Sequence, residues 1–407
     1  MYFLFVTQIE LGKASLLDSI FAGGDATVFL STLGGAVPGK GTRAVYNGGA
    51  FGSDGRLYLI PRNAGRVARF DISTQTWESF GESFPLSGNK WIDAGVSNFD
   101  GCIYSIPGEC NNVSRVLQID PSKGQGTVRM VGDSVLGLAD GVKEWPWFGT
   151  VAASDGCVYG IPRNAKSVLK FDPRQKTLST FGKLGEGLDK YRCAVLGQSG
   201  RFIFCIPNLA ARVLCIDTQT QTCELIGEDY DGSITEKWCA GAVGGDGAIY
   251  CVPRTTVDRV LRIDPWTKTT SLFGPALHAS TGWFGAVAGT DGCVYGTPYS
   301  SSRVLRIDPF ARTVSMVGGD ISPDLAAKLR HAVKGPDDAL WCLPYQLPSS
   351  ILRVQTPGPE RHTPLLTRLL EAENQGVLRE GLADANYHGP ALAAVLYHEA
   401  TRAGVSE

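Results

Sequence analysis

One phrase returns along the chain at a nearly fixed period, and this repetition constrains the fold more than any other feature. In residues 155–173 the phrase reads DGCVYGIPRNAKSVLKFDP, and in residues 291–309 it reads DGCVYGTPYSSSRVLRIDP. Aligned on its first proline, it occurs seven times, at spacings of 46, 55, 45, 46, 45 and 46 residues. These prolines are Pro61, Pro107, Pro162, Pro207, Pro253, Pro298 and Pro344. Such a period is typical of repeat architectures, in which each copy is one supersecondary unit.

Each copy contains four strand-like pieces. In the copy that ends at Gly318, these are WFGAVAG, CVYGT, RVLRID and TVSMVG, and the short segments TDG, PYSSS and PFAR separate them. β-Branched and aromatic residues dominate the four pieces, as in strands, and the segments between them are typical of turns and short loops. Seven such units predict an all-β protein, a seven-bladed β-propeller with four-stranded antiparallel blades.

The seventh copy has only three strands, because it stops after SSILRVQTPG. A matching fourth strand lies at the other end of the repeats, where FLSTLG in residues 29–34 corresponds to TLSTFG in residues 177–182. We therefore expect an N-terminal strand to complete the last blade by pairing near residues 351–354. This pairing would cover two sheet edges that otherwise stay open.

The repeats divide the chain into three segments. We expect residues 24–357 to form the propeller, residues 1–23 to be an N-terminal extension, and residues 358–407 to be a C-terminal helical tail. In the tail, Thr363 and Pro364 are a helix start signal, and the leucines of TPLLTRLLEAEN form an apolar stripe. The tail is expected either to pack under the ring or to dock on another protein.

Composition limits the partners and the compartment. The net charge of −2 gives no reason to expect nucleic acid or a membrane surface as a partner, and no apolar run is long enough to span a membrane. MYFLFV is too short for a secretory signal. The eleven cysteines include no C-x-x-C pair, and several occupy repeat positions where other copies have Ser, Gly, Ala, Leu or Arg. We expect free thiols in a reducing intracellular compartment, and neither a metal nor another cofactor.

One face of the ring, the top, collects the loops that enter the innermost strands and the loops between second and third strands. It carries a set of aromatic and basic residues at repeat positions: Trp91, Trp147, Tyr191, Trp238, Trp283, Arg62, Arg163, Arg254, Lys90, Lys190 and Lys237. In one interpretation the aromatic residues are buried wedges between blades, and the cations are solvated. In the other, aromatic and basic side chains ring the channel mouth as a binding site for a protein partner or an anion. Both interpretations can hold together.

A second feature of the channel is a break in the repeat. Six copies place Gly or Ala thirteen residues before the proline, where inner strands approach closely, but the seventh copy has His331. His278 and Glu236 lie in the top loops that precede it. A histidine pair with a carboxylate can do acid–base work or hold a metal. Alternatively, His331 fills space where the ring closes.

The sentence DGxxYxxP, followed by RVLRIDP and a closing glycine, resembles the seven-bladed propellers of the NHL and streptogramin-lyase-like group, and also loosely kelch-like repeat proteins. The resemblance covers residues 24–357. It implies a fold that hosts lyases, lactonases and binding scaffolds. For the lyases it implies a histidine acid/base and a magnesium ion held by carboxylates, and only His331, with His278 and Glu236, stands in a position to serve these roles.

Three functions follow from these observations. The first is a non-catalytic protein-interaction scaffold, a subunit of a larger assembly, which binds protein partners through the top face and the C-terminal helices. The alternative is a lyase or lactonase-like enzyme that uses His331 near the channel mouth. The third is a sensor that binds a small ligand at the channel mouth. For the scaffold, which we favour, we do not expect a small-molecule ligand.

Overall fold

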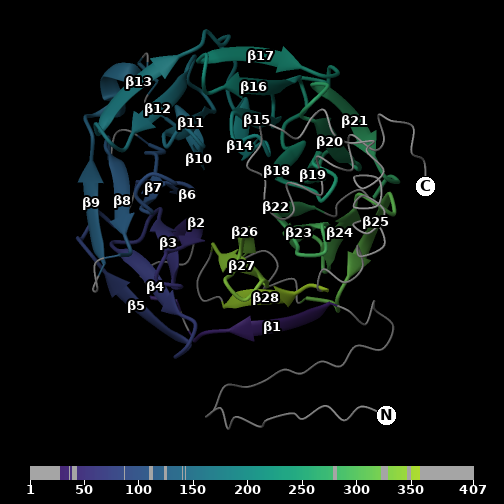
Figure 1. Cartoon of the computed structure of the whole chain (residues 1–407), viewed down its shortest axis with the longest axis horizontal. Coiled ribbons are helices and arrows are strands. Elements are labelled where there is room, and N and C mark those ends of the chain that lie inside the picture. Colours follow the sequence, from purple (N-terminus) through teal and green to yellow (C-terminus); the bar gives the residue numbers. More distant parts are fainter. Residues whose placement is uncertain are drawn as a thin grey trace, which may run out of the picture.

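The described residues form a ring of seven four-stranded antiparallel sheets, which confirms the predicted fold (Figure 1). The computed structural model describes residues 28–35, 37–38, 44–86, 88–109, 113–122, 126–139, 141–142, 144–277, 282–321, 329–345 and 350–357. In each blade the first strand lies next to the central axis and the fourth lies at the outer edge of the ring.

The strands of each blade follow one another from the axis outwards. Blade 1 has β2 (Tyr46–Phe51), β3 (Leu57–Pro61), β4 (Val67–Asp71) and β5 (Thr76–Phe80). Blade 2 has β6 (Gly95–Val96), β7 (Ile103–Ser105), β8 (Val116–Asp120) and β9 (Thr127–Val131), followed by the 3-10 helix η1 (Val135–Leu138). Blade 3 has β10 (Trp147–Ala152), β11 (Val158–Pro162), β12 (Val168–Asp172) and β13 (Thr177–Phe181). Blade 4 has β14 (Tyr191–Leu196), β15 (Phe202–Pro207), β16 (Val213–Asp217) and β17 (Thr222–Ile226).

The last three blades continue the same order. Blade 5 has β18 (Trp238–Val243), β19 (Ile249–Pro253), β20 (Val260–Asp264) and β21 (Thr269–Phe273). Blade 6 has β22 (Trp283–Ala288), β23 (Val294–Pro298), β24 (Val304–Asp308) and β25 (Thr313–Val317). Blade 7 has β26 (Leu329–Lys334), β27 (Leu340–Pro344), β28 (Ile351–Gln355) and β1 (Phe29–Leu33).

The ring closes as the sequence predicts, by pairing strands from the two ends of the repeats. Strand β1 lies antiparallel to β28, with Phe29 opposite Gln355 and Leu33 opposite Ile351 (Figure 1). Leu30 packs into the apolar cluster between blades 6 and 7. The closing strand therefore adds both backbone hydrogen bonds and buried apolar surface.

The Asp-Gly turn of the repeat is a hydrogen-bonded device between the first two strands. In blade 3, Asp155 accepts hydrogen bonds from the backbone N–H of Cys157 at 3.0 Å and from the hydroxyl of Tyr159 at 2.6 Å. Gly156 has φ +81°, which favours glycine. The same Asp–Tyr bond recurs in blades 1, 2, 5 and 6, and in blade 7 the Trp341 indole N–H takes the place of the tyrosine hydroxyl. The sequence DGxxY is thus explained by one turn that combines an aspartate, a residue with positive φ and an aromatic donor; in blade 7, Asp338 with φ 60° takes the place of the glycine.

Packing between neighbouring blades makes the core. One cluster joins Tyr104 and Val116 of blade 2 to Trp147, Leu169 and Phe171 of blade 3, and all five side chains are buried. Burial of each large apolar side chain contributes about 1.5–3 kcal/mol. Each blade is therefore stabilised mainly by its two neighbours.

Several predictions concern residues outside the described ranges. The N-terminal extension (1–23) and the C-terminal helical tail (358–407) belong to them, and so does Cys110. The ten cysteines within the described ranges are unpaired, and those at the repeat positions Cys102, Cys157, Cys205, Cys251, Cys293 and Cys342 are buried. Within the described ranges, no helix has the length and apolarity that a membrane crossing requires.

Candidate functional site

The aromatic residues that precede or open the inner strands are wedges between blades. Trp91, Trp147 and Trp283 are 0 % exposed, Trp238 is 2 % exposed and Tyr191 is 3 % exposed. Their polar atoms donate to a carbonyl just before the third strand of the same blade, as when Trp147 Nε1 donates to Ser167 O at 2.9 Å. In this structure the five side chains serve packing, as in the first interpretation, and they present no surface to a partner.

The lysines next to these aromatics are buried, so the expectation that they are solvated is wrong. Lys90 donates to Pro85 O at 2.6 Å, Lys190 donates to Gly187 O at 2.6 Å, and Lys237 donates to Asp231 O at 2.9 Å. Burial lowers the pKa of Lys90 and of Lys190 to about 8. The sequence places these lysines at the top, but it does not reveal that the preceding loop folds back and supplies a carbonyl acceptor to each ammonium group.

Three repeat positions, on the entering loops, the inner strands and directly after the second strands, supply a set of side chains that we call the top rim. The first position, two residues before the aromatic, has a left-handed backbone and holds Ala44, Asn89, Trp145, Asp189 and Glu236, with φ between 46° and 60°. The second position directly follows the residue that opens the inner strand, which is aromatic in most blades and Leu329 in blade 7. It holds Asn47, Phe148, Arg192, Phe284 and Arg330. The third position follows the proline and holds Arg62, Arg163, Arg254, Tyr299 and Tyr345.

An asparagine of the repeat fixes the left-handed position. In blade 3, Asn164 Oδ1 accepts the backbone N–H of Asp189, from the next entering loop, at 2.7 Å. In blade 1, Asn63 Oδ1 accepts the backbone N–H of Asn89 in the same way at 2.9 Å. The Pro-Arg-Asn sequences at the ends of the second strands of blades 1 and 3 therefore hold the left-handed residue of the next blade in place.

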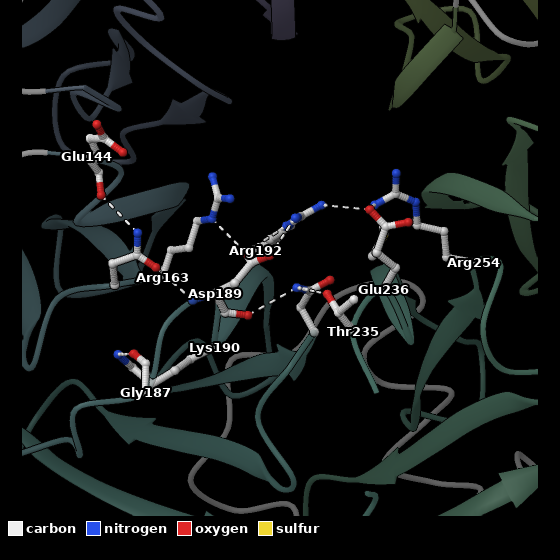
Figure 2. A network of polar contacts seen from close by, with 12 residues as sticks. Glu144, Arg163, Gly187, Asp189, Lys190, Arg192, Thr235, Glu236 and Arg254 are labelled. Carbon is white, nitrogen blue, oxygen red and sulfur yellow. Dashed lines mark hydrogen bonds and ion pairs between the residues drawn. The ribbon is translucent and has the colours of Figure 1, made fainter. Parts of the chain in front are cut away.

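Two carboxylates organise three arginines of the top rim (Figure 2). Asp189 accepts from Arg163 Nε at 2.6 Å and from Arg192 Nη2 at 2.6 Å, and Glu236 pairs with Arg254 Nη1 at 2.8 Å. Arg192 also lies 3.7 Å from Glu236, so one guanidinium joins the two carboxylates. The side chain of Arg254 is only 6 % exposed, which corrects the expectation that this cation is solvated. The Arg192 and Arg163 guanidiniums lower the pKa of Asp189, although burial opposes them.

Arg62 and Arg330 also lie against aromatic rings, as Arg163 and Arg254 do, but within the described ranges they form no ion pair. Arg62 donates to Asn89 Oδ1 and to the Tyr345 hydroxyl, both at 2.7 Å. Its Cζ is 5.1 Å from the ring centroid of Trp145. Arg330 Cζ lies 3.6 Å from the ring centroid of Tyr345 and 4.7 Å from that of Phe284. Cations stacked on aromatic faces keep much of their charge available to a further ligand.

His331 lies in the innermost strand of blade 7, as predicted. Its ring meets that of Phe284 edge to face at 5.8 Å, and within the described ranges its buried Nε2 has no hydrogen-bond partner. Burial lowers the pKa of His331, and the charges of Arg330 and Arg62 lower it further, although Asp93 opposes them. His331 is therefore neutral at pH 7.

The residues around His331 do not fit the magnesium site that the resemblance to the lyases implies. Glu236 is held by Arg254 and Arg192, and no hydrogen bond or ion pair within the described ranges links it to His331. His278 lies outside the described residues. A divalent cation placed here would meet guanidinium groups before free carboxylates, which disfavours its binding. In the described part of the chain, no three His, Cys, Asp or Glu side chains gather as metal ligands do.

Reasoning from the sequence missed the residues that organise the rim. Asp189, Arg192 and Arg330 escape the repeat pattern, since most copies have different residue types at their positions. They could be found by their distance along the sequence from the residue that opens the inner strand. Asp189 lies two residues before that residue, and Arg192 and Arg330 lie one residue after it. Comparison of all seven copies at those offsets identifies the rim.

The comparisons with known proteins agree with the architecture. No family model matches the sequence, and the search of curated proteins gives no match. Among solved structures, one titled "Streptogramin B lyase structure" has a TM-score of 0.62 at 15 % identity and covers 81 % of this chain and 98 % of its own. Virginiamycin B lyase from Staphylococcus aureus gives 0.60 at 13 %, with 81 % and 99 % covered. Kuenenia stuttgartiensis hydrazine synthase gives 0.56 at 13 %, with 75 % and 94 % covered. The chain thus has the seven-bladed fold of streptogramin-lyase-like propellers, and at these identities the likeness concerns the fold alone.

Proposed function

We propose that this protein is a non-catalytic interaction scaffold, a subunit of a larger assembly, that binds a protein partner through its top rim. The observation that carries the proposal is the arrangement of Arg62, Arg163, Arg192, Arg254 and Arg330 among aromatic rings. Arginine and aromatic side chains dominate the energetic centres of protein interfaces, because they combine large contact area with directed hydrogen bonds. The side chains of Arg163 and Arg192 are each 17 % exposed, so a partner can still reach them.

The rigidity of the rim supports the same function. Arg163 and Arg192 are fixed by Asp189, and Arg62 is fixed by Asn89 and Tyr345. Side chains already ordered before binding lose little conformational entropy when a partner arrives. We place the protein in a reducing intracellular compartment, on the support of the unpaired cysteines in the described ranges.

A capture experiment with matched variants tests the scaffold. The purified chain is immobilised, captured proteins are identified by mass spectrometry, and the affinity of the main one is measured by calorimetry. The rim variant combines Trp145→Asn with Arg163→Gln, since blade 2 already carries asparagine at the same left-handed position. We expect at least tenfold weaker binding, with a dependence on ionic strength because partly exposed charges are screened.

The control variant alters the opposite face of the propeller. Trp266→Asn with Arg312→Gln removes the same two residue types from the turns between third and fourth strands, where Trp266 is 46 % exposed. Partner affinity should not change in this variant. Equal affinities of wild type, rim variant and control for the captured protein would contradict the proposal.

His331→Ala separates the scaffold from the lyase or lactonase alternative. In a scaffold the substitution restores the small residue of the other blades, costs about 1 kcal/mol or less of stability if neighbours fill the space, and leaves partner binding intact. Cleavage of a type B streptogramin or a lactone by the wild type, abolished in His331→Ala, would support the enzyme instead.

A further inference from the structure

The arginines of the top rim are unequally neutralised. Arg163, Arg192 and Arg254 share Asp189 and Glu236, whereas in the described ranges neither Arg62 nor Arg330 forms an ion pair. The carboxylate of Glu109 accepts a hydrogen bond from Asn89 Nδ2 at 2.5 Å, and its charge favours the protonated form of Arg62, but within the described ranges it forms no ion pair with either arginine. Positive charge therefore accumulates where blades 7 and 1 meet.

One tyrosine ring brings these two arginines together. Arg62 Cζ lies 5.5 Å and Arg330 Cζ lies 3.6 Å from the ring centroid of Tyr345. Burial lowers the pKa of the Arg62 guanidinium, and the charge of Arg330 lowers it further. Two guanidiniums on one ring repel each other, and an anion between them would remove that repulsion.

Unpartnered polar atoms occur on the neighbouring inner strands β26 and β2. Among the described residues, the buried Nε of Arg330 has no hydrogen-bond acceptor. Asn47 is 1 % exposed, and within the same ranges neither atom of its amide has a partner. Asn47 follows Tyr46 as Arg330 follows Leu329, so the two occupy the same rim position in neighbouring blades. A buried polar group without a partner is costly, and a ligand with oxygen acceptors would satisfy the two donors, Arg330 Nε and Asn47 Nδ2.

The aromatic surroundings indicate what carries the anion. Tyr299 stands beside Arg330 and Trp145 stands beside Arg62, and both rings are partly exposed. These rings can cover the methylene groups of an acidic side chain while the guanidiniums bind its carboxylate. We infer that Arg62 and Arg330, with Asn47 beside them, form a receptor for one carboxylate of an acidic segment in the partner protein. The inference rests on the proposed function and names the chemistry that the partner must present.

Direct binding of an acidic probe tests the receptor without the natural partner. A fluorescent hexaglutamate peptide is titrated with wild type, Arg330→Gln, Arg330→Lys and the control Arg312→Gln, and anisotropy gives the affinities. We expect Arg330→Gln to weaken binding at least tenfold and Arg312→Gln to leave it unchanged. Arg330→Lys should be intermediate, since lysine keeps the charge but loses the planar fork of donors. Melting curves confirm that each variant is folded, and Arg62→Gln serves as the second variant if Arg330→Gln is not.

Further arms of the experiment separate the sources of the anion and the two proposals. Inorganic phosphate that binds at this site more tightly than the peptide would overturn the acidic segment in favour of a free oxyanion. Equal peptide affinities of wild type, Arg330→Gln and Arg62→Gln would overturn the receptor itself. If the peptide binds through Arg330 but no protein is captured through the rim, the receptor stands and the scaffold fails. If the captured partner responds to Trp145→Asn with Arg163→Gln but not to Arg330→Gln, the scaffold stands and the receptor fails.

Discussion

Individual buried cysteines make the stability of the folded protein depend on pH. Burial raises the pKa of Cys102 and of Cys157 to about 11, and it raises the pKa of Cys215 and of Cys342 to about 12. An unfolded thiol loses its proton at a pH of about 8.5. Above that pH the unfolded chain is stabilised by ionisation, whereas the folded chain keeps its thiols protonated.

We therefore predict that the free energy of unfolding is insensitive to these thiols below pH 8 and falls steeply above about 8.5. Each thiol removes about 1.4 kcal/mol per pH unit in that window. Lys90 and Lys190 act in the opposite direction between pH 8 and 10, because burial lowers their pKa to about 8, but the buried thiols outnumber them. Urea unfolding at pH 8, 9 and 10 measures the slope, and Cys157→Ala should reduce it. A flat profile above pH 8.5 would contradict this linkage.

The rim shows why some residues could be predicted from the sequence and others could not. The wedge role of Trp147 follows from its recurrence, because a residue type repeated in most blades serves what all blades share. Asp189, Arg192 and Arg330 depart from what most blades carry, so the repeat contains little information about them. The burial of Lys237 depends on the path of its preceding loop, and loop paths are not determined by strand periodicity.

At the level of the strand pair, the Asp-Gly turn joins two adjacent strands through one carboxylate. In blade 3, Tyr159 is 0 % exposed, and its hydroxyl donates a hydrogen bond to Asp155. Blade 4 has Phe204 three residues before its proline, where blade 3 has Tyr159, and it has no aspartate seven before. The aspartate and an aromatic donor are present or absent together, since blade 7 keeps Asp337 with the indole N–H of Trp341. A buried donor without its acceptor is costly.

A double-mutant cycle on blade 3 measures this coupling. Asp155→Ala should lower the free energy of unfolding by about 1–3 kcal/mol, because it leaves the Tyr159 hydroxyl buried without an acceptor. Tyr159→Phe alone should cost less, and the double variant should be little worse than Asp155→Ala. Denaturant unfolding of the four proteins gives the interaction energy. Strictly additive effects would mean that the hydrogen bond does not link the two strands.

For the whole molecule, closure of the ring is the feature that makes seven blades one cooperative unit. Each apolar cluster is shared by neighbouring blades, and β1 supplies the last of these contacts through Leu30 and Leu33. The sequence predicted this pairing correctly, because FLSTLG has the spelling of a fourth strand without a preceding blade of its own.

Removal of residues 1–35 should lower the melting temperature strongly or cause aggregation, since it opens the edge of β28 and uncovers blade 7. A chain that lacks only residues 1–23 keeps β1, and its melting curve isolates the contribution of that strand. Calorimetry measures both. An unchanged melting temperature after removal of residues 1–35 would contradict the topology.

The partnership of β1 with β28 also sets the timing of folding during synthesis. The ribosome makes β1 before any other strand of the ring, but β28 emerges about 320 residues later. At roughly 5–20 residues per second, β1 waits from about 15 to 60 seconds for its partner. Throughout this interval the nascent chain carries one unpaired strand at its start and an advancing open edge at its end. The oldest strand of the ring is thus the last to be paired, and translational pausing in the final blade prolongs the period in which chaperones must protect both edges.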